Sequence, residues 1–376
     1  MRKRSKYLLL EIASPFLAIF FAVLVGALVI LAIKKNPVEV YRTMFLFSFR
    51  RLDSLAIILF GATPLIFSGL AVAVGFKAGL FNIGIEGQYL IGTFLAALVG
   101  FAVKGLPAFI HLPLVILMAM VGGAVWAWLP IYLKVRRGVH EVISTIMLNY
   151  ISYSLIHFFI AEVFMDKQQG LAPGVGNPLI RLPKIASTAL MPKMHGFLSL
   201  FGIDLPDHVY LNWFFPLALL LAVGYYFLVW RTPFGYELRA VGQNPAGAEA
   251  AGIKPGAVFF KAFLLSGAIA GLTGLSDLLS YFGYMDLDFP RGYGFNGIAV
   301  ALMGKNGPLG IVLAALLFGF LNRGAEGVQA FVGVPMDTIV ILQGVMILSI
   351  VVFSEVMGRF IRQQEKKEGL QGSVVL

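Results

Sequence analysis

Residues 16–33, FLAIFFAVLVGALVILAI, form an uninterrupted apolar run without a single charged side chain. A helix needs roughly 20 such residues to cross a hydrocarbon core of about 30 Å, because it satisfies its own backbone hydrogen bonds there. A strand of a membrane barrel would instead alternate apolar and polar residues over about ten positions. The run therefore predicts a membrane-spanning helix.

The composition extends this prediction to the whole chain. Its 376 residues are 59% hydrophobic and 13% charged, with a mean hydropathy of +0.86. So few charges cannot cover the surface of an ordinary soluble protein. We predict an all-α, polytopic membrane protein that forms one transmembrane domain over residues 1–376. About ten spans are expected, at 8–33, 55–76, 86–103, 113–133, 142–163, 213–229, 259–283, 293–304, 308–323 and 336–356.

The net charge of +10 is interpreted as a topology signal, because the basic residues lie between the apolar runs. Ten spans put both termini on one side, and basic residues at both ends make that side cytoplasmic: Arg2, Lys3, Arg4, Lys6, Arg359, Arg362, Lys366 and Lys367. This topology places 17 of the 29 Lys and Arg residues inside and 12 outside. The outside group includes Lys34, Lys35, Arg42, Arg50 and Arg51 in the first external loop. The basic N-terminus resembles the start of a signal peptide, but no clear cleavage site follows, so an uncleaved first helix is expected.

An enzyme active site is not predicted. The chain has no cysteine and only five histidines, and no histidine lies at metal-ligand spacing from a carboxylate except His140 beside Glu141, which would point to different faces of a helix. The nearest match to a phosphate loop, Gly297 to Lys305, has the wrong glycine spacing and lacks the following Ser or Thr. We expect no catalytic residue, no metal and no cofactor.

Two segments are too polar and glycine-rich for simple spans: KAGLFNIGIEGQ at residues 77–88 and the segment 292–304, which begins GYGFNGI. Broken or re-entrant helices of this kind hold the binding sites of many transporters. The two segments also resemble each other, which could reflect an internal repeat, a chance similarity of apolar sequence or a duplication without function.

Five polar residues in these apolar surroundings are candidates for a substrate pathway: Asn82, Glu86, Gln88, Asn149 and Asn296. Polar groups inside a membrane are costly unless they face a water path or the interior of the bundle. Amides with few charges suit a neutral substrate rich in hydrogen-bonding groups, such as a polyhydroxyl compound or a nucleobase. The alternative is that they form interhelical hydrogen bonds of about 0.6–2 kcal/mol each.

Three connecting regions complete the organisation. Residues 164–212, rich in Gly and Pro, are expected to form an external loop, which is either a cap or a plain linker. Residues 230–258 are expected on the cytoplasmic side, where Asn244 and Pro245 would begin a short helix that Gly252 ends. This helix could insert into a groove of a partner, or the segment could be an ordinary loop. Residues 357–376 would be a cytoplasmic tail.

Three motifs in order, GLFNIGIEGQ (79–88), HEVISTIMLNY (140–150) and RAVGQNPAGAEAAGI (239–253), resemble the permeases of ABC importers for ribose, galactose and nucleosides. The likeness runs from about residue 15 to 355 and is greatest for nucleoside permeases that work with a lipoprotein. It implies transport without chemistry in this chain, two cytoplasmic ATPase subunits, a second permease subunit and an external substrate-binding lipoprotein. It does not distinguish a homodimer from a heterodimer of permeases.

In such permeases the third motif is the coupling helix on the ATPase, which implies a coupling role for Arg239, Ala240, Gly242, Asn244, Glu249 and Gly252. Its Glu-Ala-Ala signature is shortened here. The resemblance implies import of nucleosides, purine nucleosides above all. A simple-sugar or branched-chain amino acid importer is the alternative within the class, and a proton-driven carrier using Glu86 and Asp277 is the alternative outside it.

Overall fold

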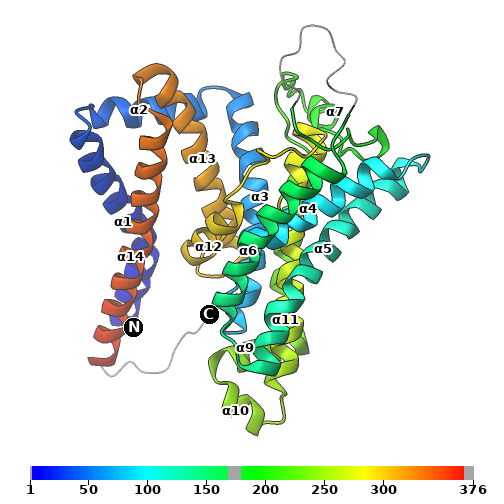
Figure 1. Ribbon diagram of the computed structural model, residues 1–376. Helices are drawn as coiled ribbons and strands as arrows, with labels where there is room; N and C mark the ends of the chain where they lie inside the picture. Colours follow the sequence, from blue (N-terminus) through cyan, green and yellow to red (C-terminus); the bar gives the residue numbers. More distant parts are fainter. Residues whose placement is uncertain (1, 168–178, 368–376) are drawn as a thin grey trace. The chain divides into compact units, whose positions relative to one another are not determined.

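The computed structural model describes residues 2–167 and 179–367 and confirms the all-helical prediction (Figure 1). Its long helices are α1 (Arg2–Ala32), α2 (Pro37–Phe49), α3 (Leu52–Lys77), α4 (Ile85–Ala102), α5 (Ala108–Arg137), α6 (Glu141–Phe158), α8 (Phe214–Arg231), α9 (Pro233–Gln243), α11 (Pro255–Gly271), α12 (Tyr293–Met303), α13 (Pro308–Val332) and α14 (Met336–Lys367). Shorter elements are η1 (Phe159–Val163), η3 (Ser187–Ala189), α7 (His195–Ser199), α10 (Pro245–Ala250) and η4 (Asp277–Phe282).

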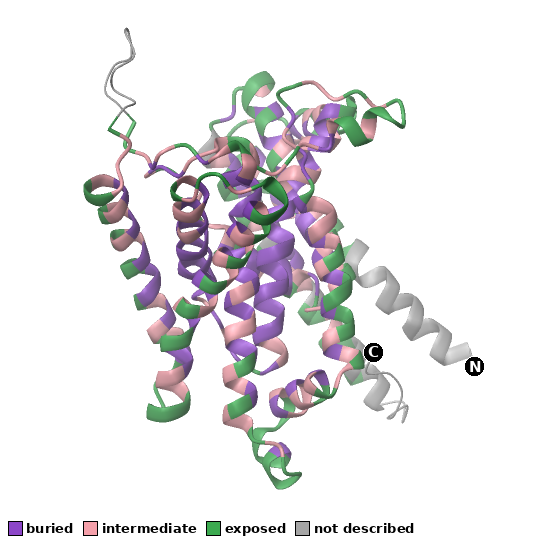
Figure 2. Ribbon diagram, turned by 90° about the vertical axis from the view of Figure 1, so that its right-hand side faces the viewer, coloured by how far each residue is buried: buried purple, intermediate pink, exposed green. Residues whose placement is uncertain are grey.

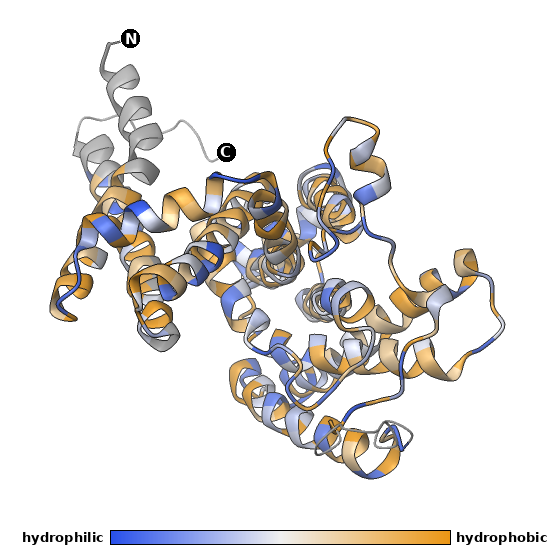
Figure 3. Ribbon diagram, turned by 90° about the horizontal axis from the view of Figure 1, so that it is seen from above, coloured by the Kyte–Doolittle hydropathy of each residue, from blue (hydrophilic) through white to orange (hydrophobic). Residues whose placement is uncertain are grey.

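Among the described residues, seven helices are long and apolar enough to span a membrane, or eight elements if α1 and α2 count as one broken span. α11 and α12 are apolar but shorter, at 17 and 11 residues. At about 1.5 Å per residue, α12 reaches roughly 16 Å, half of a hydrocarbon core. The structure thus confirms a multi-span helical protein, but not the predicted count of ten or the internal repeat. Hydrophobic residues dominate the helices, and hydrophilic residues gather in the connections (Figure 3).

The chain divides into two compact units, residues 1–54 with 320–376 and residues 55–319. In the first, α1 packs along α14, with Phe21 stacked on Phe353 at 5.2 Å between ring centroids. α1 and α2 meet at an angle of 118°. Asn36 caps α2 by accepting a hydrogen bond from the backbone N–H of Val38 (2.9 Å), and Pro37 occupies the first turn, where its missing N–H costs nothing.

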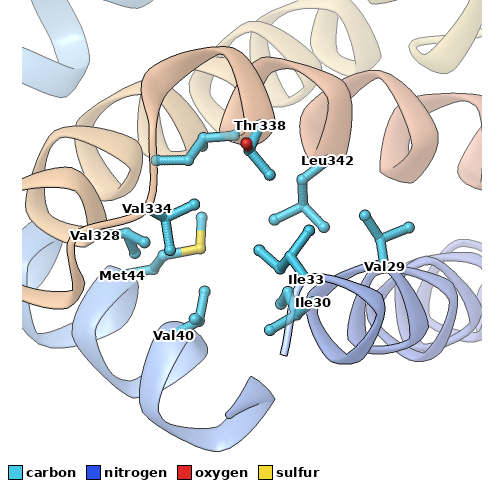
Figure 4. Close-up of a pocket in the computed structure, with 10 residues that line it drawn as sticks. Val29, Ile30, Ile33, Val40, Met44, Val328, Val334, Thr338 and Leu342 are labelled. Atoms are coloured by element: carbon cyan, nitrogen blue, oxygen red, sulfur yellow. The ribbon is translucent and has the colours of Figure 1, made fainter. Parts of the chain in front are cut away.

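The helix α2 lies in the region that the sequence analysis assigned to the first external loop. Lys34, Arg42 and their basic neighbours suggested a solvated connection, but Val40 and Met44 are buried against neighbouring helices. Together with Val29 and Leu342 they line a small apolar crevice of this unit (Figure 4). The basic residues therefore occupy a helix and its flanks, because successive turns of α2 place Val40 and Met44 on one apolar face.

The second unit has α3 and α4 at its centre, and both are largely buried (Figure 2). α5 and α11 pack closely on each other through glycines, beside α4. A Cβ atom added at Gly123 would lie 2.0 Å from the carbonyl oxygen of Gly267, and one at Gly271 would lie 2.0 Å from that of Ala119. Small residues spaced four apart let membrane helices approach at backbone distance, and this interface uses that device.

The two ends of this unit differ in character. At one end, the described part of 164–212 forms η3, α7 and two isolated bridges, one of which joins Arg181 to Asp286. At the opposite end, α9 and α10 project from the bundle (Figure 1). The first region lies between α6 and α8, and the second lies between α8 and α11.

Candidate functional site

The connection between α3 and α4, residues 78–84, is a real break in the helices. Gly79 has a φ of +73°, a conformation that L side chains rarely adopt, so glycine ends α3 here. Side chains of α6 satisfy the backbone groups that the break exposes. Glu141 accepts from the N–H of Phe81 (3.2 Å), and Asn149 donates to the carbonyl of Ile83 (3.0 Å). Irregular backbone is tolerated within a membrane protein only when it is satisfied in this way.

Asn82 and Gln88 form a closed pair in this break. The Asn82 amide nitrogen donates to Gln88 Oε1 (2.9 Å), and the Gln88 nitrogen donates back to Asn82 Oδ1 (3.0 Å). Asn82 also donates to Ser266 Oγ (2.9 Å) and accepts from the backbone N–H of Gly84 (3.1 Å). Both side chains are buried, so in this conformation their hydrogen bonds join the break to α4 and α11.

Glu86 holds the N-terminus of α12. Its side chain is fully buried, and its two oxygens accept from the backbone N–H groups of Gly292 (2.7 Å) and Gly294 (2.9 Å). The hydroxyls of Tyr89 (3.3 Å) and Tyr153 (3.2 Å) also donate to it. A carboxylate at a helix N-terminus satisfies orphan N–H groups and the positive end of the helix dipole. α12 begins partway along the unit, so this carboxylate closes an internal half-helix end (Figure 1).

The structure brings four of the five predicted pathway residues together. Asn149 accepts from the N–H of Gly87 (2.9 Å), one residue from Glu86, and therefore caps the start of α4. Asn296, the fifth, lies on α12 with an exposed side chain. Its link to the other four pathway residues is indirect, through α12, whose N-terminus Glu86 caps.

Two members of this network were not singled out by the sequence. Glu141 was considered only as a metal ligand beside His140, but it pairs with Lys134 and supports Phe81. The basic last turn of α5, which contains Lys134, is the sequence feature that could have predicted this ion pair. Ser266, which donates to the carbonyl of Ala71 (2.7 Å), gave no signal, because a serine in an apolar helix is common. The described residues contain no group of three or more His, Asp or Glu side chains that could hold a metal ion.

The predicted coupling residues lie on α9, α10 and the turn after them. Thr232 caps α9 by accepting from the N–H of Gly235 (3.0 Å), and Asn244 caps α10 by accepting from Gly247 (3.0 Å). Gly252, with a φ of +86°, ends the segment. Asn244, Glu249 and Gly252 are exposed, and Arg239 and Ala240 are partly buried.

Gly242 joins this projection to the break. A Cβ atom added there would lie 2.2 Å from the carbonyl oxygen of Lys77, and one at Gly79 would lie 3.2 Å from the carbonyl oxygen of Gly242. The end of α9 thus touches the end of α3 backbone to backbone. No flexible side chain separates the projecting helices from the residues that Asn82 and Glu141 organise.

These features define a class of protein. A multi-span helical bundle, a broken helix, an internal half-helix and a projecting pair of capped helices are the parts of a membrane transporter. The comparison with known sequences supplies the family. The chain belongs to the permease components of branched-chain amino acid transport systems, whose family profile matches residues 54–351.

Named relatives agree with this membership. The chain is 37% identical to the guanosine ABC transporter permease protein NupP of Bacillus subtilis (strain 168), over 98% of this chain and 99% of the relative. It is 33% identical to the glucose ABC transporter permease protein TsgB13 of Haloferax volcanii, over 91% of this chain and 87% of the relative. It is also 33% identical to the nucleoside ABC transporter permease protein NupB of Lactococcus lactis subsp. cremoris, over 91% of each chain.

A second guanosine permease of Bacillus subtilis, NupQ, is 28% identical over 69% of this chain and 77% of the relative. No solved structure matches the chain significantly. The family and these relatives confirm the resemblance found in the three sequence motifs.

Proposed function

We propose that this chain is the permease subunit of an ATP-binding cassette importer and that it carries nucleosides, chiefly purine nucleosides, into the cytoplasm. The similarity over nearly the whole chain to a guanosine permease supports the substrate class. Partner subunits bind and hydrolyse ATP, and this chain provides the path across the membrane.

One contact favours a neutral substrate. Free N-termini of half-helices in transporters are suited to anionic substrate groups. Here Glu86 already occupies the N-terminus of α12 through Gly292 and Gly294. A second anionic group would meet the Glu86 carboxylate, which argues against the carboxylate of an amino acid at this point. Nucleosides and sugars carry no such charge.

A simple-sugar importer is the second candidate, because a glucose permease is 33% identical to this chain. A proton-driven carrier is a weaker candidate. It would use Glu86 or Asp277, which are buried carboxyl groups, and its uptake would collapse with the proton gradient and survive the loss of ATP.

The proposed topology has ten spans, with α11 plus η4 and the short α12 completing the series. Both termini and the tail 357–376 then lie in the cytoplasm, and 164–212 lies outside; residues 168–178 and 368–376 of these segments are outside the described residues. The projecting segment 230–258 faces the cytoplasm and docks on the ATPase, through the exposed and half-buried residues Arg239, Ala240, Gly242, Asn244, Glu249 and Gly252.

The proposed complex contains two permeases, two ATPase subunits and an external lipoprotein that delivers the substrate. Two guanosine permeases of one organism, NupP and NupQ, both resemble this chain, and NupP resembles it more. A heterodimer with a sister permease is therefore favoured over a homodimer.

The test is uptake of radiolabelled guanosine and adenosine by cells with and without the gene, with excess ribose or glucose as competitor. Gene-dependent and ATP-dependent uptake that neither sugar suppresses is expected. Uptake that a sugar abolishes, or gene-dependent uptake of sugar alone, would move the function to the sugar importers.

A further inference from the structure

An exposed apolar cluster lies around α7, at the end of the second unit opposite α9 and α10 (Figure 1). It consists of Phe197, Leu200, Phe201 and Trp213, which are 42%, 80%, 68% and 39% exposed. The exposure of Leu200 is the highest among the large hydrophobic side chains of the described residues. The ring of Phe197 lies 5.3 Å from the ring of Phe201 and 5.3 Å from that of Trp213, between centroids. The four side chains therefore form one apolar surface, and such a surface usually has a partner that covers it.

The inner side of α7 is fastened to the bundle. The backbone N–H of Met194 donates to the carbonyl of Leu211 (2.9 Å), and Met194 belongs to a buried cluster with Val209 and Leu211, against which Leu198 packs. Met194 and Leu198, four residues apart, thus face the interior, as one face of a helical turn does. The apolar cluster occupies the opposite face, so its exposure is a consequence of well-packed structure and not of a loose connection.

The polar groups of this connection are directed away from the apolar cluster. Lys193 donates from its ammonium group to the carbonyl of Asp207 (2.6 Å) and lies 4.0 Å from the centroid of the Tyr210 ring. The His195 ring hydrogen-bonds the carbonyl of Val209 (2.8 Å). α7 therefore separates an apolar surface from a hydrogen-bonded one within a single turn.

Trp213 sets the depth of the apolar cluster. It is the N-cap residue of α8, an apolar helix long enough to span a membrane. Trp213, Leu220 and Phe227 follow one another at intervals of seven residues and so share a face of α8, on which Leu220 is 66% and Phe227 is 55% exposed. Tryptophan at the end of a span is typical of the level at which the hydrocarbon core meets the headgroups. The apolar cluster, which contacts Trp213 through Phe197, lies at the same level.

We propose that the apolar cluster inserts into the lipid bilayer at this boundary and anchors α7 there. Lipid is favoured as the occupant because the cluster continues the exposed apolar face of α8 and because its four side chains carry no charge. Short segments with Phe, Trp and Leu on one face and polar groups on the other lie in the plane of the interface, with the apolar face about 5–10 Å deep. The inference requires that α8 spans the membrane, and it does not depend on which substrate is transported.

The anchor has a consequence for the helices behind it. Asn212, next to Trp213, donates from its side chain to Ser276 Oγ (3.0 Å), and Ser276 directly precedes η4. The backbone N–H of Met191 also donates to the carbonyl of Leu279 in η4 (3.0 Å). A lipid contact at the apolar cluster therefore fixes the height of η4 in the membrane as well as that of α8.

The test uses the absence of cysteine from the chain. A nitroxide label is attached to the purified full chain at Leu200→Cys or Phe201→Cys, and the chain is measured in phosphatidylcholine–phosphatidylglycerol vesicles, alone and assembled with its partner subunits. Collisions of the label with molecular oxygen are compared with collisions with a water-soluble nickel chelate. Leu220→Cys on the exposed face of α8 is the lipid reference, and Asp204→Cys at an exposed residue of the same connection is the water reference. These positions are all exposed, so the labels should not disturb folding.

The ratio of oxygen to nickel collision rates is expected to be about tenfold higher at positions 200 and 201 than at 204, because the bilayer takes up apolar oxygen and excludes the polar chelate. The ratio at 200 and 201 should approach that at 220 and should persist after assembly. A ratio at 200 equal to that at 204 would place the cluster in water and overturn the anchor. A label shielded from both reagents at 200, or at the reference position 220, would assign this surface to a protein contact and overturn it equally.

Discussion

Replacing Glu86 with glutamine is expected to free the N-terminus of α12. Glutamine has nearly the same shape, but one of its two terminal atoms is a donor. One of the backbone N–H groups of Gly292 and Gly294 would therefore face another N–H group and lose its acceptor. The negative charge at the helix N-terminus would be lost as well.

The magnitude follows from these two losses. A hydrogen bond to a charged group contributes about 1.5–3 kcal/mol. A charge at a helix terminus contributes about 0.3–1 kcal/mol, rising to about 2 kcal/mol when it is partly buried. We expect a combined loss of about 3 kcal/mol in the local stability of α12. This corresponds to a roughly hundredfold increase in the population of its open state.

The chain offers a direct assay because it contains no cysteine. A single cysteine at Val300, which is 0% exposed on α12, should react slowly with a maleimide reagent in otherwise unchanged protein. Adding Glu86→Gln should accelerate labelling by one to two orders of magnitude. Glu249→Gln, at an exposed carboxylate on α10, is the matched control and should leave the rate unchanged. Equal labelling rates in Glu86→Gln and wild-type backgrounds would refute the assignment of Glu86 as the cap of α12.

Three further changes probe the packing around the break. Gly242→Val should abolish uptake while the protein still inserts, because a side chain there meets the carbonyl of Lys77; uptake at the wild-type rate would contradict the coupling contact. Gly123→Leu should prevent stable folding, seen as loss of a monodisperse peak in detergent, whereas Gly224→Ala, with open space around it, should have no effect. Asn149→Leu should lower the apparent melting temperature by several degrees, because each buried group that loses a partner costs about 1–3 kcal/mol. An unchanged melting temperature would exclude Asn149 as a structural support.

The sequence located the long helices well, because each has a continuous apolar run. The ends of the predicted spans 55–76 and 86–103 lie within three residues of those of α3 and α4. The prediction failed at α2, because this helix has only 13 residues and is flanked by Lys34, Lys35, Arg50 and Arg51, so no apolar run of span length marks it. The count of ten was not reached because α11 and α12, with 17 and 11 residues, are shorter than a full span. α12 begins inside the bundle, and the sequence does not reveal where in the membrane a helix starts.

The candidate site was predicted in position but not in its contacts. Glycines and amides at 77–88 indicated a break, and the structure contains one. The partners of its residues come from helices far away in sequence, such as Ser266, 184 residues beyond Asn82. Such pairings depend on how α4, α6 and α11 pack, and no local pattern in one sequence encodes that. Whether the amides also contact substrate stays a prediction, which the uptake experiments address.

The contacts around the break also connect α9 physically to α12, so a displacement of α9 could reach α12. Gly242 touches the end of α3 through backbone atoms, and the next residues of the break are bonded to α6 through Glu141 and Asn149. α6 in turn donates from Tyr153 to Glu86, which holds α12. Close-packed contacts of this kind transmit small displacements because they have little room to absorb them. A motion of α9 would therefore act on α12 through the side chains of Glu141, Asn149, Tyr153 and Glu86. Removing Asn149 should weaken that connection before it unfolds the bundle.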